Sequence, residues 1–365
     1  MAEVVATPAV RRKPVFHSLA VSAVERLTDD AVAVTFAVPD ELREAYRFEA
    51  GQHLNIRTSL AGDDVRRSYS ICSPEGGPLR VGVKLLPGGA FSSYVHGSLA
   101  VGDVLEVMTP MGHFSTPLDP ANAKRYAFIA AGSGITPVMS LMATILEREP
   151  ASDVVLVFGN RTTASVMFLE ELEELKDRYL GRVQLIHVLS REEQDAPLLH
   201  GRIDADKLTA LLDGLIPVDS VDEWFLCGPF GLVETARKTL VASGADERHV
   251  HLELFHAEPL APSTAEVVET PGEGAEVTVI LDGRRTNLTL PSAGRSVLDA
   301  LLAVRADAPY ACKGGVCGTC RARVVEGEVR MDTNYALEAD EVERGFVLTC
   351  QSHPVSEKVT LDFDA

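Results

Sequence analysis

The spacing of hydrophobic and polar residues changes twice along the chain. From residue 15 to about 118, short runs alternate between hydrophobic and polar positions, with turn residues between them and little helical periodicity. Such alternation is typical of β-strands with one buried face. Several short strands in succession predict an antiparallel β-barrel. The predicted strands are 32–38, 52–57, 68–73, 79–85 and 104–108.

A second pattern covers residues 122–255, where predicted strands and helices alternate. The run 126–131 is hydrophobic without interruption, as expected for a parallel strand buried on both faces. The stretch 126–146 carries no charge, but a glycine turn and Pro137 divide it into pieces too short to cross a bilayer. We therefore expect an α/β domain with a parallel sheet. Its further strands are predicted at 154–158, 183–189, 224–229 and 250–255.

The C-terminal part returns to short strands. An Asp282-Gly283 turn joins two alternating runs as a β-hairpin, and Ser296 begins a helix as its N-cap. This order suits a small β-grasp domain of mixed α+β class. The elements are predicted at 277–281, 286–290, 296–305, 321–325, 327–331, 346–350 and 358–363.

The changes in pattern define the expected domains. The segment 256–275 is rich in proline and glutamate and has no Lys or Arg, which indicates a solvated linker. We expect a barrel domain at 13–120, an α/β domain at 121–255 and a β-grasp domain at 276–365.

Four cysteines have the spacing of an iron–sulfur site. Cys312, Cys317 and Cys320 follow the pattern C-x4-C-x2-C, and Cys350 completes the set. This is the plant-type spacing for a [2Fe–2S] cluster held by four thiolates. Glycines between the cysteines allow the backbone turns that bring three ligands together. A zinc site or two disulfides are the alternatives, although zinc usually takes two C-x2-C pairs or Cys/His mixtures.

A glycine turn follows the first strand of the α/β domain. Gly132 and Gly134 come directly after that strand, Thr136 is a suitable N-cap, and Pro137 suits the first helical position. The turn would present the N-terminus of a helix to a pyrophosphate, because free N–H groups and the helix dipole favour an anion. Strand, glycines, cap and helix in this order predict a dinucleotide site.

The composition limits the classes of partner and the cellular compartment that we expect. The 365 residues suffice for two or three domains, and a net charge of −19 argues against nucleic acids and anionic membranes as partners. The acidic excess also suits a basic docking face on a protein partner. Six cysteines, four of them assigned to a cluster, point to a reducing compartment, so we expect a cytoplasmic protein. Residues 1–13 have no apolar run typical of a signal peptide.

The cysteine region resembles the plant-type ferredoxin domain, and the barrel resembles the flavin domain of the ferredoxin–NADP reductase superfamily. The flavin resemblance rests on Arg67-Ser68-Tyr69-Ser70 and a later glycine turn. It implies FAD, with Arg67 at the flavin phosphates, Tyr69 on the flavin, and Ser70 near N5. Gly89 and Ser92 would receive the phosphates at a helix start. The implied flavin site also includes Ser68, Val83 and Lys84.

The element Cys227-Gly228-Pro229 resembles the nicotinamide contact of the same superfamily, and Glu253 or Phe255 would reach the flavin edge. Ser70, Cys227 and Glu253 are thus the candidate catalytic residues.

The second and third strand ends of the α/β domain bear on the choice of nucleotide. They offer Arg161, Ser190 and Arg191, which suit a 2′-phosphate, so we expect NADPH rather than NADH. Glu192 and Glu193 follow immediately and would favour NADH if either carboxylate bound the ribose.

The order of flavin, nicotinamide and ferredoxin domains resembles the reductase components of multicomponent oxygenases. The implied function is passage of electrons from NAD(P)H to a partner oxygenase, where the oxygen chemistry occurs. Within this group, the stretches 67–72, 134–140, 331–337 and 348–354 most resemble the reductases of di-iron phenylacetyl-CoA 1,2-epoxidases. Reductases of Rieske-type oxygenases, such as ketosteroid hydroxylases, are the alternative. An electron carrier without hydride chemistry is an alternative of another class.

Overall fold

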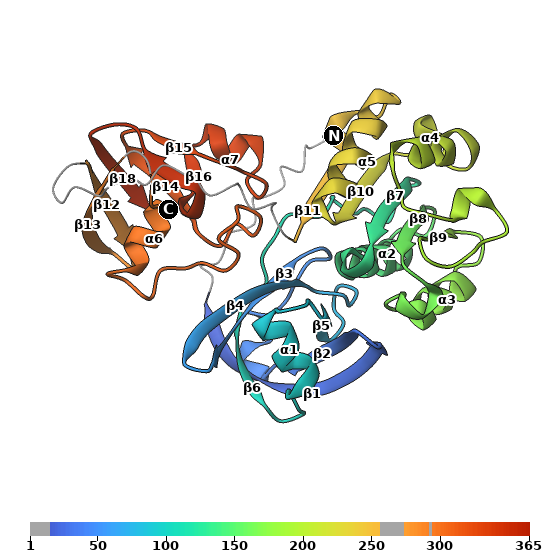
Figure 1. Ribbon diagram of the computed structural model, residues 1–365, viewed down its shortest axis with the longest axis horizontal. Coiled ribbons are helices and arrows are strands. Elements are labelled where there is room, and N and C mark those ends of the chain that lie inside the picture. Colours follow the sequence, from blue (N-terminus) through green and yellow to red (C-terminus); the bar gives the residue numbers. More distant parts are fainter. Residues whose placement is uncertain (1–14, 256–273, 292–293) are drawn as a thin grey trace.

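The computed structural model describes residues 15–255, 274–291 and 294–365. The expectation about residues 1–13 lies outside this range, as does almost all of the predicted linker 256–275. Three separate sheets account for most of the described strands and meet around a common centre (Figure 1). The antiparallel, parallel and β-grasp classes predicted for the three parts are all confirmed.

The N-terminal sheet is a closed antiparallel barrel with strand order β4-β3-β6-β1-β2-β5. An isolated bridge between Ile71 and Val81 joins the end of β4 to β5 and closes it. Helix α1 (Ala90–Gly97) lies against the barrel and buries Phe91 in its core (Figure 1). The strands are β1 (Phe16–Thr28), β2 (Ala31–Ala37), β3 (His53–Leu60), β4 (Asp63–Ser70), β5 (Leu79–Lys84) and β6 (Val104–Met108).

Three barrel strands differ from the expectation, and the simplest case is β3, which continues to Leu60 rather than ending at residue 57. The alternating pattern did not predict β1, because register shifts near Ser22 and Leu27 interrupt its alternation. Strand β4 begins at Asp63 rather than at 68, because a tight turn at Ala61-Gly62 pairs Asp63 with Leu60.

The central domain is a five-stranded parallel sheet of order β11-β10-β7-β8-β9. Helices α2 and α3 cover the face toward the barrel, and α4 and α5 cover the other face (Figure 1). The strands are β7 (Arg125–Ala131), β8 (Asp153–Asn160), β9 (Val183–Leu189), β10 (Glu223–Gly228) and β11 (Val250–Leu254). The helices are α2 (Ile135–Arg148), α3 (Leu169–Arg178), α4 (Ala205–Gly214) and α5 (Phe230–Ala242).

The strand order reverses between β7 and β10. The chain proceeds from β7 to β8 and β9 on one side, then returns to place β10 on the other side of β7. The carboxyl ends of these two central strands therefore form the switch point at which open α/β sheets bind ligands.

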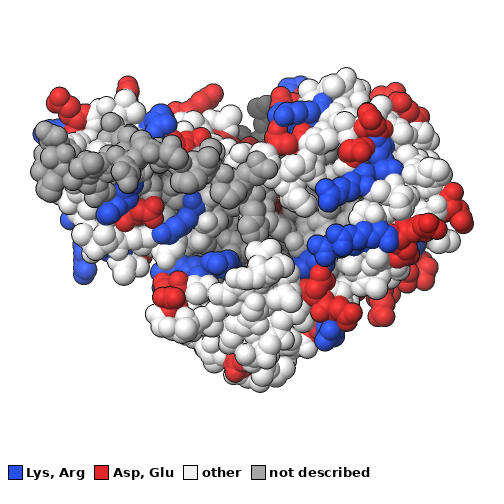
Figure 2. All heavy atoms as spheres, in the orientation of Figure 1, with Lys and Arg blue, Asp and Glu red and all other residues white. Residues whose placement is uncertain are grey.

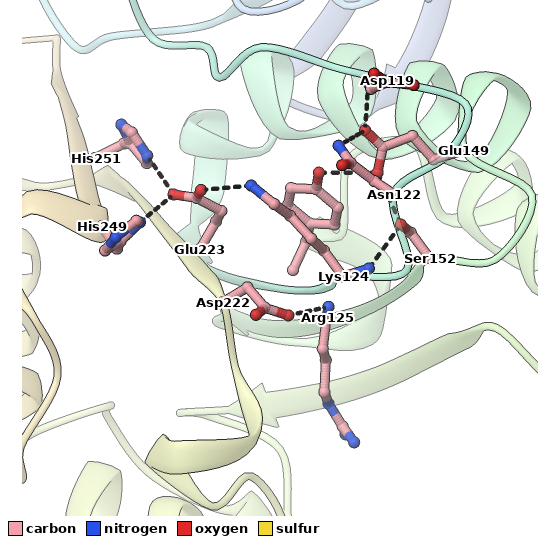
Figure 3. A network of polar contacts seen from close by, with 11 residues as sticks. Asp119, Asn122, Lys124, Arg125, Glu149, Ser152, Asp222, Glu223, His249 and His251 are labelled. Carbon is pink, nitrogen blue, oxygen red and sulfur yellow. Dashed lines mark hydrogen bonds and ion pairs between the residues drawn. The ribbon is translucent and has the colours of Figure 1, made fainter. Parts of the chain in front are cut away.

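A polar network closes the opposite, amino end of this sheet (Figure 3). Glu149 is fully buried, and its oxygens accept hydrogen bonds from Asn122, Tyr126, Ser152 and the Asp119 backbone. Nearby, buried Glu223 pairs with Lys124 and with two histidines, His249 and His251. Each buried carboxylate is thus compensated, as its burial requires.

The C-terminal sheet has the order β13-β12-β18-β14-β16, with β12 and β18 parallel. The Asp282-Gly283 turn is confirmed, since both residues have positive φ, and Ser296 caps α6 through the Asp299 N–H. The elements are β12 (Ala275–Leu281), β13 (Arg284–Leu290), α6 (Val297–Leu302), β14 (Arg321–Glu326), β15 (Val329–Met331), α7 (Ala339–Glu343), β16 (Phe346–Leu348), β17 (Ser352–Pro354) and β18 (Lys358–Asp362).

Strong contacts join the barrel to the α/β domain. Arg80 forms a two-point ion pair with Glu171, and Arg148 pairs with Glu75. Gly82 lies against α2, where a Cβ would come within 2.7 Å of the Thr136 methyl group. No helix in the described part of the chain is long and apolar enough to cross a membrane.

Candidate functional site

The four predicted cluster ligands come together in one loop region. Cys317, Cys320 and Cys350 are buried, and Cys312 is partly buried. Their thiols lie in two adjacent pairs, Cys312 with Cys317 and Cys320 with Cys350. All four are free of disulfides. Among the described residues, no three His, Cys, Asp or Glu side chains are arranged around a single metal ion. Two thiol pairs suit the two irons of a [2Fe–2S] cluster and not one zinc ion.

The loop backbone has left-handed turns at two of the three glycines between the cysteines, and Gly314 is the exception. Gly315 and Gly318 have φ of 76° and 66°, and Lys313 also has positive φ. The Gly314 N–H donates to Cys312 Sγ at 3.3 Å. Such N–H donors stabilise the negative charge of thiolates.

The stretch 331–337, noted above only for its resemblance, supports this loop. The Tyr335 N–H donates to the Gly315 carbonyl, and a Cβ on Gly315 would come within 3.2 Å of Thr333. Gln351 donates to the Lys313 carbonyl at 2.9 Å and accepts from the Thr333 hydroxyl at 2.8 Å. These contacts hold the cysteine loop against the segment that carries Cys350.

The predicted flavin motif occupies the end of β4. Tyr69 lies against Phe91 of α1, with ring centroids 5.5 Å apart. Ser70 is buried, whereas the Arg67 side chain is exposed and donates one hydrogen bond to the Arg66 carbonyl. The exposed guanidinium of Arg67 is thus available to an anion, and Tyr69 offers a ring beside α1.

The start of α1 has the free N–H groups expected of a phosphate site, but the Ser92 hydroxyl has a different partner from the one expected. Gly89 is the N-cap, and the first N–H groups of the helix have no acceptor within it. The Ser92 hydroxyl instead accepts from the Leu86 N–H and closes the turn. Val83 lies in the barrel core and Lys84 pairs with Asp30, so neither side chain is free to contact a flavin.

Two candidate catalytic residues from different domains meet. Ser70 Oγ lies 3.3 Å from both carboxylate oxygens of Glu253 on β11. Burial raises the pKa of Glu253 to about 8, and the Ser70 hydrogen bond only partly opposes this. Cys227 lies opposite Glu253 in the β10–β11 ladder, and burial raises its pKa well above the usual value. At neutral pH both groups are therefore protonated.

A cleft at this point is lined by all three domains. The barrel contributes His53, the β11 end contributes Phe255, and the cysteine loop contributes Val316. The complete lining is His53, Ser68, Ser70, Glu253, Leu254, Phe255, Val316 and Cys317. The cleft has a volume of about 20 Å³, and a group bound here would lie between the Ser70–Glu253 pair and Cys317.

His53 provides a test of whether the cleft suits a flavin. Burial, together with His113, lowers its pKa to about 4, so the imidazole is neutral. Its Nε2 is buried and has no hydrogen-bond partner among the described residues. A bound group with a hydrogen-bonding atom at this point, as a flavin has, would satisfy His53 Nε2.

The glycine turn of the α/β domain lies at the switch point. A Cβ on Gly134 would come within 2.2 Å of the Cys227 carbonyl, so only glycine allows this approach. The expected N-cap is wrong: α2 begins at Ile135 after Gly134, and the Thr136 hydroxyl donates back to the Ser133 carbonyl. Pro137 still falls in the first helical turn, where its missing N–H leaves no intrahelical bond unmade.

The neighbouring strand ends bring Arg161 and Arg191 together, since the Arg191 N–H donates to the Arg161 carbonyl. Ser190 lies beside them. The two carboxylate oxygens of Glu192 accept hydrogen bonds from the N–H and hydroxyl of Thr163 at 2.8 and 2.7 Å. Pro229 caps α5 directly after Gly228, at the other side of the switch point.

Family models match three consecutive parts of the chain. They describe an oxidoreductase FAD-binding domain at 18–116, an oxidoreductase NAD-binding domain at 128–238 and a 2Fe-2S iron–sulfur cluster binding domain at 279–355. The component designated E of the 1,2-phenylacetyl-CoA epoxidase from Escherichia coli (strain K12) is 47% identical over 96% of this chain and 98% of its own. The chain belongs to the family of this epoxidase component. It is therefore an oxidoreductase with sites for FAD, a nicotinamide nucleotide and a [2Fe–2S] cluster.

The wider resemblance covers the same three domains. The ferredoxin reductase component of 3-ketosteroid-9-alpha-monooxygenase from Rhodococcus rhodochrous is 35% identical over 94% of this chain and 96% of its own. Phthalate dioxygenase reductase, described as a modular structure for electron transfer from pyridine nucleotides to [2Fe-2S], superposes with a TM-score of 0.57. It is 26% identical and covers 95% of this chain and 98% of its own. The fold class and the cofactor classes expected from the sequence are thus confirmed.

Proposed function

We propose that this reductase takes hydride from NADPH and passes the electrons singly to the oxygenase component of a phenylacetyl-CoA epoxidase. The observation that carries the proposal is the cleft shared by Ser70, Glu253 and Cys317, because it joins a hydride site to a cluster ligand. Bound FAD accepts two electrons at once and releases them one at a time, and the cluster carries one. The 47% identity to an epoxidase component supports the choice of partner.

The chain's own residues have distinct proposed tasks. Arg67 and the Gly89–Ser92 helix start bind the flavin phosphates, Tyr69 supports the ring system, and the Ser70–Glu253 pair holds a proton beside it. Val83 and Lys84 would contribute through their backbone.

At the switch point, the turn at Gly132 and Gly134 binds the pyrophosphate, with Thr136 and Pro137 in its helix. Cys227, Gly228 and Pro229 support the nicotinamide.

The proposed domains are 13–120, 121–255 and 276–365, with 256–275 as their linker. We also propose that the protein acts in the cytoplasm, since all six cysteines, including the four ligands, are free thiols.

Reconstitution tests the function directly. The purified reductase, NADPH and the di-iron oxygenase component should together convert phenylacetyl-CoA, and omission of any one should abolish turnover. A pull-down with the native chain should recover that oxygenase. Recovery of a Rieske protein in its place would support the ketosteroid-type alternative, which the 35% relative represents. Cluster bands without flavin bands in the visible spectrum would instead indicate a carrier.

A further inference from the structure

We propose that Asn55 of the flavin domain orients the Thr319 hydroxyl toward Cys317 and thereby raises the reduction potential of the cluster. The inference rests on the proposed electron path, but it concerns a residue outside the motifs that define that path. Asn55 lies on β3, and Thr319 lies in the cysteine loop, 264 positions later. Asn55 would therefore act as a positioning residue between two domains.

The contacts form an unbroken chain from the flavin motif to a cluster ligand. The Ser68 hydroxyl lies 2.6 Å from Asn55 Oδ1, and Asn55 Nδ2 lies 2.8 Å from Thr319 Oγ1. Thr319 Oγ1 in turn lies 3.0 Å from Cys317 Sγ. Asn55 is fully buried and Thr319 is only 3% exposed. Water therefore does not compete for these hydrogen bonds, and the low dielectric strengthens them.

The surroundings determine which end of the Asn55 amide faces Thr319. The sulfur atoms of Met108 and Met111 lie 3.5 and 3.3 Å from Asn55 Nδ2. A thioether sulfur can accept a hydrogen bond but cannot donate one. The NH2 group therefore belongs on this side, and the opposite orientation would direct the amide oxygen at two further acceptors.

The direction of the last hydrogen bond follows. Because Asn55 donates to the Thr319 oxygen, the single hydroxyl proton of Thr319 is left for another acceptor. A cysteine bound to iron would be a thiolate and could only accept. The other acceptor within reach of the Thr319 hydroxyl is Met111 Sδ at 3.7 Å, which is more distant and uncharged, so Thr319 donates to Cys317 at 3.0 Å. A donor on a ligand sulfur stabilises the added negative charge of the reduced cluster and raises its potential. The potential would then depend on the flavin domain being docked against the cysteine loop.

Potentiometric titration of the full-length protein, followed by the cluster signal in electron paramagnetic resonance, tests this proposal. Thr319→Val removes the hydroxyl and should lower the potential, whereas Thr319→Ser should keep it. Asn55→Leu should also lower the reduction potential of the cluster. We expect the equilibrium constant for reducing the cluster to fall about tenfold in either variant, which corresponds to about 59 mV for one electron.

A double-mutant cycle separates an effect of Asn55 on the orientation of the Thr319 hydroxyl from a general disturbance of the structure. If Asn55 acts through Thr319, Asn55→Leu should have no further effect in the Thr319→Val background. Equal shifts in both backgrounds, or an unchanged potential in Asn55→Leu alone, would overturn the proposal. Should Asn55→Leu fail to fold, Asn55→Asp serves, because its carboxylate accepts from Thr319 and should also lower the potential. An unchanged potential in Asn55→Asp would count against the proposal in the same way.

Arg66→Met is the matched control. Arg66 also joins the two domains, with its guanidinium 4.1 Å from the Tyr310 ring centroid, but it is not part of the hydrogen-bond chain through Thr319. Its replacement should leave the potential unchanged, and a shift equal to that of Asn55→Leu would assign the effect to docking alone. A protein with no cluster signal at all would refute the proposed function, whereas a normal signal with unmoved potentials would refute only this inference.

Discussion

At the scale of single residues, the proton on Glu253 is the most consequential feature of the cleft. A carboxyl with a pKa of about 8 is neutral at pH 7 and becomes charged as the pH rises through 8. A negative charge at this point would oppose the arrival of hydride electrons beside Ser70. Perturbed titratable groups of this kind are concentrated at functional sites.

Replacement of Glu253 by Gln should therefore change both rate and pH dependence. Gln is neutral at every pH, like the protonated carboxyl, but it cannot give up a proton, so we expect kcat for NADPH-dependent ferricyanide reduction to fall by roughly 10²-fold, the lower end of proton-transfer contributions. The wild type should lose rate as the pH rises through about 8, and Glu253→Gln should lack this decline. Stopped-flow flavin reduction between pH 6 and 9.5 measures both effects. Identical profiles in the two proteins would rule out a role for this proton.

We expect the protein to prefer NADPH and Arg191 to determine this preference. Since Glu192 is occupied by Thr163, no carboxylate is directed from that position to a ribose 2′-OH, and Arg191 offers a cation for a 2′-phosphate. Arg191→Ala should weaken NADPH binding by roughly 1.5–3 kcal/mol, the range for a hydrogen bond to a charged group, with NADH little changed. The exposed Arg178→Ala is the control. Equal weakening of both nucleotides, or a higher kcat/KM for NADH in the wild type, would contradict this assignment.

The sequence predicted those residues whose chemistry is carried by local spacing. Cys312, Cys317 and Cys320, and the motifs around Ser70 and Cys227, could be identified as candidates from neighbouring residues, whereas Cys350 lies 30 positions beyond Cys320. The Asn55–Thr319 contact could not, because a buried asparagine on a strand has no local sign of a partner in another domain. Likewise, only the folded structure, in which the cleft has formed, reveals that His53 Nε2 has no hydrogen-bond partner among the described residues.

At the scale of elements, the alternation of hydrophobic and polar residues predicted the bounds of strands well only where the pairing between strands is regular. Strand β6 matches its predicted bounds, whereas bulges hid β1. The predicted strand 346–350 ends at Leu348, because the following 3-10 turn is needed to direct Cys350 toward Cys320. Helix α6 ends at Leu302 rather than at residue 305, and Val304 beyond it is exposed. At the cluster site, the positions required of the cysteines therefore decide where the strand ends, and the strand propensity of the sequence does not.

Gly134 should be irreplaceable for a steric reason. A Cβ there would lie 2.2 Å from the Cys227 carbonyl, a backbone atom that cannot move aside cheaply. Gly134→Ala should destabilise the protein by roughly 1–3 kcal/mol, as overpacking does, and should raise KM for NADPH. Gly231→Ala is the matched control, because a Cβ at that helical position meets nothing within 4 Å. Thermal unfolding and steady-state kinetics check both variants. A Gly134→Ala protein with unchanged Tm and KM would contradict the close approach.

Glu223 should make the α/β domain sensitive to acid. Burial opposes its ionisation, but hydrogen bonds from His251, Lys124 and His249 outweigh burial and lower its pKa to about 2 (Figure 3). The resulting stability, roughly 3 kcal/mol, is present above pH 4.5 and is lost as the pH falls toward 2. Glu223→Gln should therefore be less stable than wild type at pH 7, with the gap closing below pH 4.5.

Urea unfolding at several pH values measures the Glu223 effect. The exposed Glu357→Gln should show no such gap. A difference between Glu223→Gln and wild type that stays constant from pH 7 to 2.5 would mean that the carboxylate's charge does not contribute.

At the scale of the whole molecule, the charge distribution is uneven. Figure 2 shows acidic side chains along the outer edge of the α/β domain near α3, with both signs mixed elsewhere on this face. Most acidic residues of α3 are solvated, although Glu171 pairs with Arg80. The net charge of −19 therefore does not by itself mark the oxygenase docking face. The order of the domains was predictable from motifs, but their docking was not, because it rests on scattered contacts such as Phe230 with Tyr335.

The modular arrangement leads to a prediction about Cys350. Cys350→Ser should remove or severely destabilise the cluster, because the adjacent thiols of Cys320 and Cys350 would both bind the same iron. The flavin residues of β4 and α1 belong to a separate core, so FAD should remain bound. The variant should still reduce ferricyanide with NADPH at a rate within about threefold of wild type, but it should fail to support the oxygenase. Absorbance spectra, iron content and the two assays measure these outcomes. A normal cluster spectrum in Cys350→Ser would disprove the fourth ligand, and loss of ferricyanide reduction with FAD retained would show that hydride transfer depends on the docked cluster.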